Sequence, residues 1–480
     1  MLFASFPFLF LFLPILVWLW KLTAGEDKAR LSVLLLGASL LFGACQGLEA
    51  LLLLLGLTVV NYLFGLLLAD EGHRRRRLGR RGLLLLAVLL NVLVWCRFRH
   101  LPALSAWLAQ WQDILPVLAP AAMPAGFSFA VLIQLAWLLG VYQRRIRPEG
   151  IVRQALFTTC FPYALSGPLV RYEEMGPQLD ALEVPQAEDL ARGLGLMVLG
   201  LAKKMLLADS LAPAADAVFH AAAQGLPLST AEAWLGALSY TFQIYFDFSG
   251  YSDMAIGMGR IFGFKYPENF RLPYTSRSIT EFWRRWHISL GSFFRDYVYI
   301  PLGGKKKHQL LNMAVVWALT GLWHGASWNF VLWGLYFFVI LAAEKTIGEK
   351  RLRRIPTILR RVGTMLLVIL GWNIFYFTDL TQLLQHFGLL FGLLGAGFSN
   401  AQTGIQLVNN LPLLLVCAIG ATSVPQNLGN LFGGVCVQGG KRSGQIVYAC
   451  VTFVFDAVLL ALSTIALVGS TYNAFLYFRF

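Results

Sequence analysis

Hydrophobic residues form long continuous runs along the chain, and short polar segments separate these runs. A helix that crosses a bilayer needs about 20 consecutive apolar residues. Several runs reach this length, and others are shorter, so tilted, broken or re-entrant segments are expected. We therefore predict an all-α polytopic membrane protein with about 11–13 membrane segments. The predicted helices lie at residues 2–20, 31–46, 48–69, 82–97, 126–143, 190–208, 233–260, 311–328, 329–345, 362–378, 382–397, 405–422 and 447–470.

The composition agrees with one membrane domain over residues 1–480. The chain is 57% hydrophobic and 13% charged, whereas about 25% of the residues of a soluble protein are charged. The longest polar stretches, residues 171–188 and 423–445, are too short to bury a core of their own. No soluble domain is predicted.

The net charge of +14 lies mainly in short loops between the apolar runs. Such loops mark the cytoplasmic side and contact anionic headgroups. We therefore predict the lipid bilayer as a partner and no binding of nucleic acid. The most basic loop, residues 73–81, is predicted to be cytoplasmic, which places the N-terminus outside if residues 31–46 and 48–69 both cross.

Metal ligation is not expected. The six cysteines include no Cys-x-x-Cys pair, and no spacing of cysteine and histidine resembles a zinc site. We interpret the cysteines as small apolar packing residues.

One segment, residues 274–329, concentrates ionisable residues within the apolar chain. Such residues are costly at membrane depth, so by default they suggest a functional site. Ser278 and Glu281 fit a capping box, which predicts a helix that begins near Ile279. This amphipathic helix either contributes to a site or serves only as an interfacial anchor. Its two faces carry Arg284, His287, Gly291 and Phe294 on one side, and Arg285, Ser289, Ser292 and Asp296 on the other.

A second histidine, His324, ends the apolar run that begins near residue 311. A neutral imidazole enclosed by tryptophans suits a general base. The alternative is a packing histidine whose nitrogens are satisfied by a hydroxyl or a carbonyl. A pair of glycines four residues apart lets another backbone come close. The helical stripe and the glycine pair comprise Trp317, Thr320, Gly321, His324, Gly325 and Trp328.

Two other sets of charges have open interpretations. Asp247 and Asp253 lie in an aromatic helix, where they either orient a histidine or an arginine, or pair structurally with Arg271, Arg284 or Arg295. Lys305, Lys306 and Lys307 follow a break at Gly303–Gly304, and they either anchor the topology or bind the phosphates of a nucleotide-like donor.

Five motifs in order resemble those of the membrane-bound O-acyltransferases, and the closest branch is the bacterial one typified by the alginate O-acetylation membrane protein. The resemblance is strongest over residues 120–345. The motifs are Tyr245–Asp253 (YFDFSGYSD), Asn269–Tyr274 (NFRLPY), Glu281–Leu290 (EFWRRWHISL), Arg295–Gly304 (RDYVYIPLGG) and Gly321–Gly325 (GLWHG), and Phe161–Pro162 and Ser166–Arg171 (SGPLVR) fit the same branch.

The resemblance implies an acyltransferase of a bacterial inner membrane. By motif, His324 matches the catalytic histidine and His287 the second functional histidine. His324 would take the proton of the acceptor hydroxyl, and His287, Asp296 or Arg295 would position the donor or stabilise the oxyanion. The chain has no Gly-x-Ser-x-Gly motif, so no serine nucleophile of that type is expected. The donor would be acetyl-CoA on the cytoplasmic side, with no bound cofactor.

Several functions are compatible with the motifs. O-acetylation of an alginate-type exopolysaccharide is the first choice, and peptidoglycan or cellulose is the alternative acceptor. From other classes, a transporter or a scaffold without catalysis is the rival. Because the predicted acceptor lies outside the cytoplasm, a separate periplasmic or membrane-anchored acetyltransferase is the expected partner. The outer loop at residues 107–124 is either the predicted dock for this partner or an interfacial aromatic belt.

Overall fold

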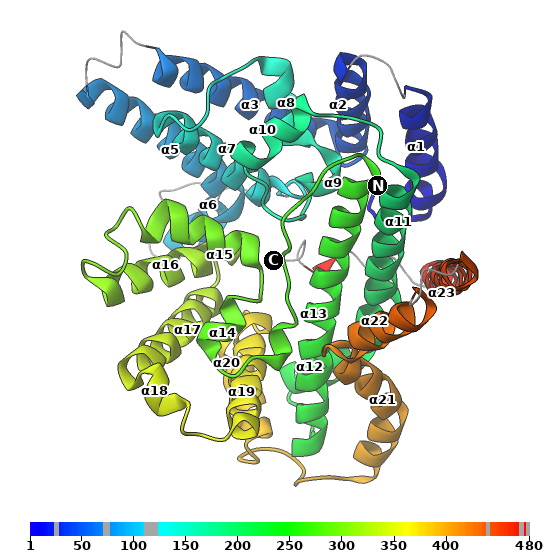
Figure 1. The fold of residues 1–480 in the computed structure, drawn as a ribbon. Helices are drawn as coiled ribbons and strands as arrows, with labels where there is room; N and C mark the ends of the chain where they lie inside the picture. The colour runs from blue at the N-terminus through cyan, green and yellow to red at the C-terminus, as the bar shows by residue number, and fades with distance from the viewer. Residues whose placement is uncertain (24–27, 71–76, 110–122, 438–441, 470–474, 477–480) are drawn as a thin grey trace. The chain divides into compact units, whose positions relative to one another are not determined.

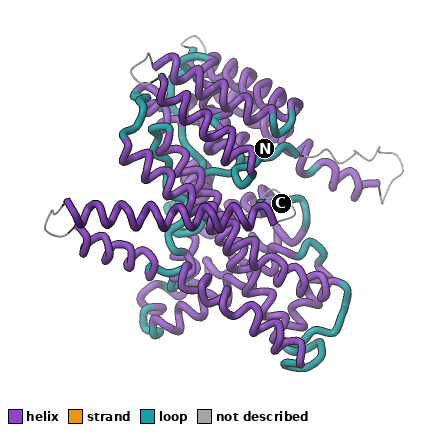
Figure 2. Tube along the Cα trace, turned by 90° about the vertical axis from the view of Figure 1, so that its right-hand side faces the viewer, coloured by secondary structure: helices purple, strands orange, loops and turns teal. Residues whose placement is uncertain are grey.

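The computed structural model describes residues 1–23, 28–70, 77–109, 123–437, 442–469 and 475–476. Over these residues every regular element is a helix and no strand occurs (Figure 2). The predicted all-α class is confirmed. The basic loop used for the predicted orientation lies largely outside the described residues, as does most of the predicted dock.

The helices fall into two compact units, which are described separately. The first unit comprises residues 1–197, 254–268 and 292–301, and the second comprises residues 198–253, 269–291 and 302–480. Three helices continue from one unit into the other, namely α11 (Ala187–Ala202), α13 (Thr230–Ile261) and α15 (Ile288–Phe294).

The first unit is a helical bundle in which α3 packs against α5, α7 and α8 (Figure 1). Three buried amide side chains, from Asn61, Asn91 and Gln134, hydrogen bond to one another between α3, α5 and α7. Amides at membrane depth are stabilised in this way because lipid offers them no partners. The helices of this unit are α1 (Leu13–Leu22) with η1 (Phe8–Phe12), α2 (Lys28–Ala44), α3 (Leu48–Ala69), α5 (Arg77–Arg99), α6 (Leu101–Ala109), α7 (Phe127–Tyr142), α8 (Ile151–Thr159), α9 (Phe161–Ala164), α10 (Tyr172–Asp180) and η4 (Arg295–Tyr299).

The second unit is built around α17, which packs against α14, α16 and α19. A separate pair, α22 and α23, packs together, and α23 also contacts η2. The helices of this unit are η2 (Lys203–Ala208), α12 (Asp209–Ala223), η3 (Pro273–Thr275), α14 (Ile279–Trp283), α16 (Gln309–His324), α17 (Trp328–Ile347), α18 (Glu349–Leu352), α19 (Thr357–Tyr376), α20 (Leu380–Leu390), α21 (Ala401–Gly420), α22 (Val424–Val437) and α23 (Arg442–Gly469).

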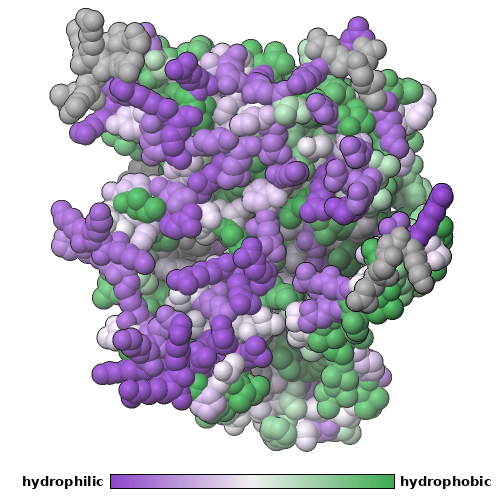
Figure 3. Space-filling view, in the orientation of Figure 1, coloured by the Kyte–Doolittle hydropathy of each residue, from purple (hydrophilic) through white to green (hydrophobic). Residues whose placement is uncertain are grey.

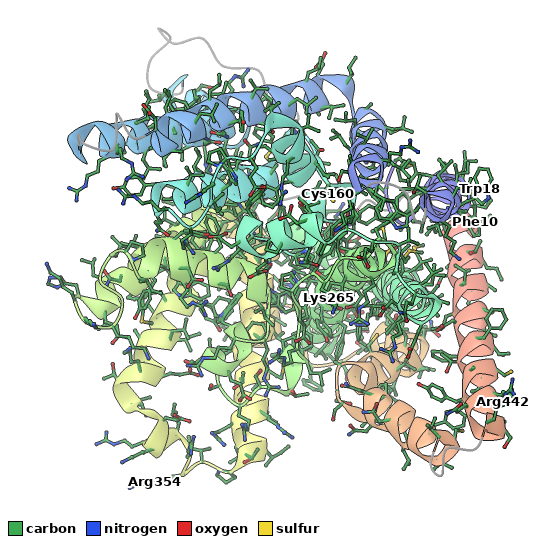
Figure 4. The ribbon with its side chains drawn as sticks, turned by 45° about the horizontal axis from the view of Figure 1, so that its top comes forward. Phe10, Trp18, Cys160, Lys265, Arg354 and Arg442 are labelled. Atoms are coloured by element: carbon green, nitrogen blue, oxygen red, sulfur yellow. The ribbon has the colours of Figure 1, made fainter. Side chains whose placement is uncertain are left out.

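Among the described residues, six helices are long and apolar enough to cross a membrane. Their exposed apolar side chains are suited to lipid. Phe10 of η1 and Trp18 of α1 are also exposed and project outward (Figure 4). Figure 3 shows hydrophobic surface over α21 and α22. The six helices lie at Leu48–Ala69, Gly79–Arg99, Trp328–Ile347, Thr357–Tyr376, Ala401–Gly420 and Arg442–Gly469, and shorter apolar helices lie at Phe8–Leu22 and Phe127–Tyr142.

Every predicted apolar run coincides with a helix, within a few residues at most ends. The missed helices are amphipathic or short, such as α8, α10 and α12, which lack a continuous apolar run. A hydropathy pattern detects helices that face lipid on most sides, and it passes over those that pack only one face.

Candidate active site

His324 is the last residue of α16, and aromatic rings hold its side chain. The imidazole is 6% exposed. Its ring meets Trp333 edge-on at a centroid distance of 5.1 Å and Phe375 edge-on at 5.0 Å. Trp333 belongs to α17 and Phe375 to α19, so two neighbouring helices fix the position of this side chain.

Close contact between α16 and α17 brings His324 against these rings. A Cβ atom on Gly321 would lie 2.4 Å from the carbonyl oxygen of Phe330, and a Cβ atom on Gly325 would lie 2.2 Å from the Phe330 ring. Real Cβ atoms do not approach this closely, so both positions need glycine. The predicted close approach of another backbone is confirmed at Gly321, whereas Gly325 meets a side-chain ring.

The predicted surroundings of His324 were partly wrong. Trp328 is 71% exposed and does not enclose the imidazole, while Trp317 packs against Trp283, Trp333 and Phe337. The hydroxyl of Thr320 donates to the Val316 carbonyl of its own helix, at 2.8 Å. The helical stripe identified the residues of one face, but the adjacent helices supply the enclosing rings.

His287 lies at a break between two short helices rather than within one long helix. Ser278 caps α14 by accepting from the Glu281 backbone N–H at 3.0 Å, as predicted, but α14 ends at Trp283 and α15 begins at Ile288. The prediction of a continuous amphipathic helix is therefore wrong.

Backbone pairing with the preceding loop stabilises this break. The Ile288 N–H donates to the Asn269 carbonyl at 3.0 Å, and the Arg271 N–H donates to the Arg285 carbonyl at 2.9 Å. One consequence is that Arg284 is exposed and does not share a helical face with His287. Glu281 and Arg285 form an ion pair at 2.6 Å.

The backbone of His287 adopts a left-handed conformation with φ of +45°. For a residue with a Cβ atom this conformation costs about 1–3 kcal/mol, and such residues cluster at functional sites. The side chain is 4% exposed, and its ring meets the Phe248 ring edge-on at 4.7 Å. Burial lowers the pKa of His287 to about 3, so the imidazole is neutral at physiological pH.

Trp323 contacts both histidine rings. Its centroid lies 4.9 Å from that of His324 and 6.4 Å from that of His287. The second unit therefore gathers both predicted catalytic histidines around one indole. Imidazoles in such an apolar setting are suited to proton transfer with water excluded.

Asp247 and Asp253 pair with lysines that the sequence interpretation did not consider. Lys203 contacts Asp253 at 2.5 Å, and Lys204 contacts both Asp247 and Asp209 at 2.6 Å. Both carboxylates contact lysines because the π-helical turn η2 brings two adjacent lysines against α13. This cluster of lysines and aspartates could have been inferred from the sequence, because two adjacent lysines lie near the end of the apolar run 190–208.

Arg295 and Asp296 belong to the first unit, where Asp296 binds two arginines. Arg295 contacts Asp296 at 2.6 Å and Arg171 contacts it at 2.5 Å. Partial burial would raise the pKa of Asp296, but hydrogen bonds from Arg295 and Arg171 outweigh burial and hold this pKa below its ordinary value. The carboxylate is therefore ionised, and its predicted role toward the donor stays a prediction.

The segment that carries the motifs Phe161–Pro162 and Ser166–Arg171 borders a small cavity. Ala164 and Leu165 border a largely apolar space of about 50 Å³ in the first unit, together with Gly126 and Thr159. This space is too small for an acyl donor, so it does not belong to the candidate active site.

Lys305, Lys306 and Lys307 form an exposed turn before α16. Gly303 and Gly304 adopt left-handed conformations there, with φ of +113° and +56°, which confirms the predicted break. The Asn312 amide donates to the carbonyls of Gly304 and Lys307 at 3.1 and 2.7 Å and closes the turn.

Exposed cations also occur farther along the second unit, on and after α18. They include Lys350, Arg351, Arg353 and Arg354. Figure 4 shows Arg354 pointing away from the helices, and Figure 3 shows hydrophilic surface in this region. Because these cations are also exposed, their substitution can serve as a control for substitution of the lysines of the turn.

Two further polar residues support the His287 break, and neither was assigned a role from the sequence. Glu344 of α17 accepts from the N–H groups of Ile279 and Thr280 at 2.6 and 2.8 Å, at the start of α14. Asn269 lies 3.2 Å from His287 through its Oδ1 atom. Asn269 begins the motif Asn269–Tyr274, which was the available signal.

The family model for membrane-bound O-acyltransferases matches residues 81–385. The chain belongs to this family. The resemblance inferred from the five motifs is thereby confirmed, and this membrane-bound O-acyltransferase is a multi-pass membrane enzyme.

Relatives of this membrane-bound O-acyltransferase extend over most or all of its length. It is 35% identical to "Probable alginate O-acetylase AlgI" of Azotobacter vinelandii over the whole of both chains. It is 39% identical to the protein of the same name in Pseudomonas aeruginosa, over 78% of this chain and 72% of the relative. It is 30% identical to "Peptidoglycan O-acetyltransferase" of Helicobacter pylori, over 98% of this chain and 96% of the relative.

Proposed function

We propose that this enzyme moves an acetyl group from acetyl-CoA in the cytoplasm toward a polysaccharide outside the inner membrane of a bacterial cell. An alginate-type exopolysaccharide is the proposed acceptor, since relatives named alginate O-acetylase match at 35–39% identity. Peptidoglycan is the second candidate, because the Helicobacter pylori relative also matches nearly the whole chain.

The observation that carries the proposal is the pair of buried histidines around Trp323. In the proposed reaction the acceptor hydroxyl oxygen attacks the thioester carbonyl carbon while His324 takes the hydroxyl proton. The carbon–sulfur bond then breaks, and the imidazolium returns the proton to the leaving thiolate. The aromatic walls keep out water, which would otherwise hydrolyse the donor.

The three lysines of the exposed turn are the proposed contact for the phosphates of the donor. They extend from a turn that precedes α16, the helix that ends at His324. A flexible ammonium group is a suitable point charge for phosphate. The turn leads directly into the helix that carries the proposed base, and this supports the role.

The acceptor can be tested in the native bacterium. O-acetyl groups are quantified in each exopolysaccharide and cell-wall fraction, with the gene deleted and with the wild-type or His324→Ala gene restored. We expect acetyl to be lost from the exopolysaccharide and restored only by the wild-type gene. Loss from peptidoglycan alone would replace the proposed acceptor. Full restoration by a well-expressed His324→Ala protein would favour a scaffold or transporter.

We also propose that a separate periplasmic or membrane-anchored acetyltransferase receives the acetyl group and passes it to the polymer. No folded polysaccharide-binding domain is present among the described residues, which are helices of a membrane protein. The test uses liposomes that contain this enzyme, with acetyl-CoA inside and polysaccharide outside. Efficient acetylation of the polymer by the enzyme alone would contradict the relay.

A further inference from the structure

Asn269 lies in the loop between α13 and η3, and its side chain is fully buried beside His287. Four neighbouring groups contact the amide. The Ser289 backbone N–H and the Ser289 hydroxyl both donate to Oδ1, at 3.2 and 2.9 Å. The Nδ2 group donates to the Ser252 hydroxyl at 3.1 Å, and Nδ1 of His287 lies 3.2 Å from Oδ1.

These contacts determine which way the amide points. A backbone N–H can only donate, so the atom that faces the Ser289 N–H must be the oxygen. The amino group of the amide then faces Ser252, whose hydroxyl oxygen can accept. The orientation of Asn269 therefore follows from one obligatory donor.

The same oxygen faces His287, and this determines the tautomer of the imidazole. A carbonyl oxygen can only accept, so Nδ1 of His287 must carry the proton. In a neutral imidazole the other nitrogen, Nε2, then holds the lone pair and accepts hydrogen bonds. We propose that Asn269 is a positioning residue that fixes the Nδ1–H tautomer of His287, in which Nε2 can accept a hydrogen bond but cannot donate one.

This inference rests on the proposed function of His287 and narrows it. A neutral His287 in this tautomer has no proton on Nε2, so it cannot donate from that atom to the oxyanion. Of the two roles expected for His287, positioning the donor is the one that remains, and the proton of the acceptor hydroxyl is left to His324. Stabilisation of the oxyanion must then come from other donors.

The surroundings of His287 support a fixed imidazole. The ring packs against Phe248 and Trp323, which are uncharged. The main chain of Asn269 also contributes, because its carbonyl accepts from the Ile288 N–H. Thus one residue holds both the ring and the backbone at the left-handed break.

The test compares two substitutions of Asn269 by the pH dependence of kcat/KM for acetyl transfer in purified enzyme. Asn269→Asp keeps oxygen acceptors for Ser289 and His287 but adds a charge, which raises the pKa of a neighbouring imidazole. We expect this variant to be within a few-fold of wild type at pH 8. Its activity relative to wild type should fall as the pH is lowered to about 5.5, because protonation removes the lone pair of Nε2.

Asn269→Leu removes both acceptor contacts, and we expect it to lower kcat/KM about 100-fold at every pH. The matched control is Asn373→Leu, another fully buried asparagine, whose amide donates to the Ile369 carbonyl of its own helix at 2.8 Å. Thermal unfolding in detergent is measured for each variant. The control should lose stability without losing activity per folded enzyme.

Three outcomes separate the hypotheses. Wild-type kcat/KM in a folded Asn269→Leu enzyme would overturn the role of Asn269, even if His287→Ala is inactive. An Asn269→Asp enzyme whose activity relative to wild type is the same at all pH values would also overturn it. Full activity of His287→Ala would instead refute the proposed function of that histidine. If the Asn269→Leu enzyme does not fold, the role of Asn269 is tested by the pH dependence of the Asn269→Asp activity relative to wild type.

Discussion

The two histidines of the candidate active site are held by different kinds of contact. His324 ends a regular helix and lies between the rings of Trp333 and Phe375. His287 lies at a break in the backbone, in contact with the Asn269 amide. Rings determine where an imidazole lies, whereas a hydrogen bond also determines which nitrogen carries the proton.

The two kinds of contact suit two roles. The rings around His324 fix the position of its imidazole, as transfer of a proton to a bound substrate requires. The amide beside His287 holds that imidazole in a single tautomer, which suits a group that positions a substrate.

The largest effect is expected from His324→Ala, which removes the proposed base. Acetyl transfer should fall by about 10²–10⁴-fold, the usual contribution of general base catalysis. Insertion should be intact, because one buried side chain does not alter the basic loops that set topology. Polymer acetyl content and protein level in the membrane are measured together. Normal acetylation at a normal protein level would remove His324 from the mechanism.

A smaller loss, about 100-fold, is expected from His287→Ala, because a misplaced substrate slows the reaction without abolishing proton transfer. His287→Gly sharpens the comparison. Glycine adopts φ of +45° without strain, so the glycine variant should be inactive to the same degree but melt at a higher temperature than the alanine variant. Full activity of the His287→Ala enzyme would show that residues 281–287 serve only as an interfacial anchor.

The next largest effect is expected from a change in the packing of α16, the helix that ends at His324, against α17. Gly321→Ala should destabilise the enzyme by about 1–3 kcal/mol, since overpacking forces α16 and α17 apart, and activity should fall with it. The control is Gly363→Ala in α19, where a Cβ atom meets nothing within 4 Å. Thermal unfolding of both variants is compared with acetyl transfer. Equal stability of the two proteins would contradict the close approach.

The smallest effect is expected from changing Lys305, Lys306 and Lys307 together to Gln. The KM for acetyl-CoA should rise several-fold at low salt, and the difference from wild type should shrink as ionic strength increases. The control changes Lys350, Arg351 and Arg354 to Gln, which removes the same charge from other exposed positions. Equal donor dependence of the two triple variants would leave the turn as a topology anchor.

The sequence predicted the long helices and the two histidines for different reasons. Helices that face lipid are apolar on most sides, so their composition alone reveals them. His324 and His287 were identified by their motifs. The break at His287 could not be predicted, because residues 279–290 contain neither glycine nor proline and the break is stabilised by backbone pairing with the preceding loop, which has no local sequence signature.

Long-range pairing also explains the misassigned carboxylates. Asp247 and Asp253 were matched to arginines that shared their region of the chain, but Lys203 and Lys204 reach them through the π-helical turn η2. Asn269 was noted only as part of a motif, since a single buried amide has no periodic signature. Local patterns therefore predicted elements, and three-dimensional contacts were needed to assign roles.

The lysine cluster has a consequence for how the protein is made. Lys203 emerges from the ribosome 50 residues before Asp253, the carboxylate that neutralises it. At about 5–20 residues per second, this interval lasts roughly 3–10 seconds. During this time an unpaired ammonium group at membrane depth would cost about 2.5–3.5 kcal/mol. The Lys203–Asp253 pair therefore forms only after α13 has been synthesised, and the turn η2 reaches its final contacts later than its place in the sequence suggests.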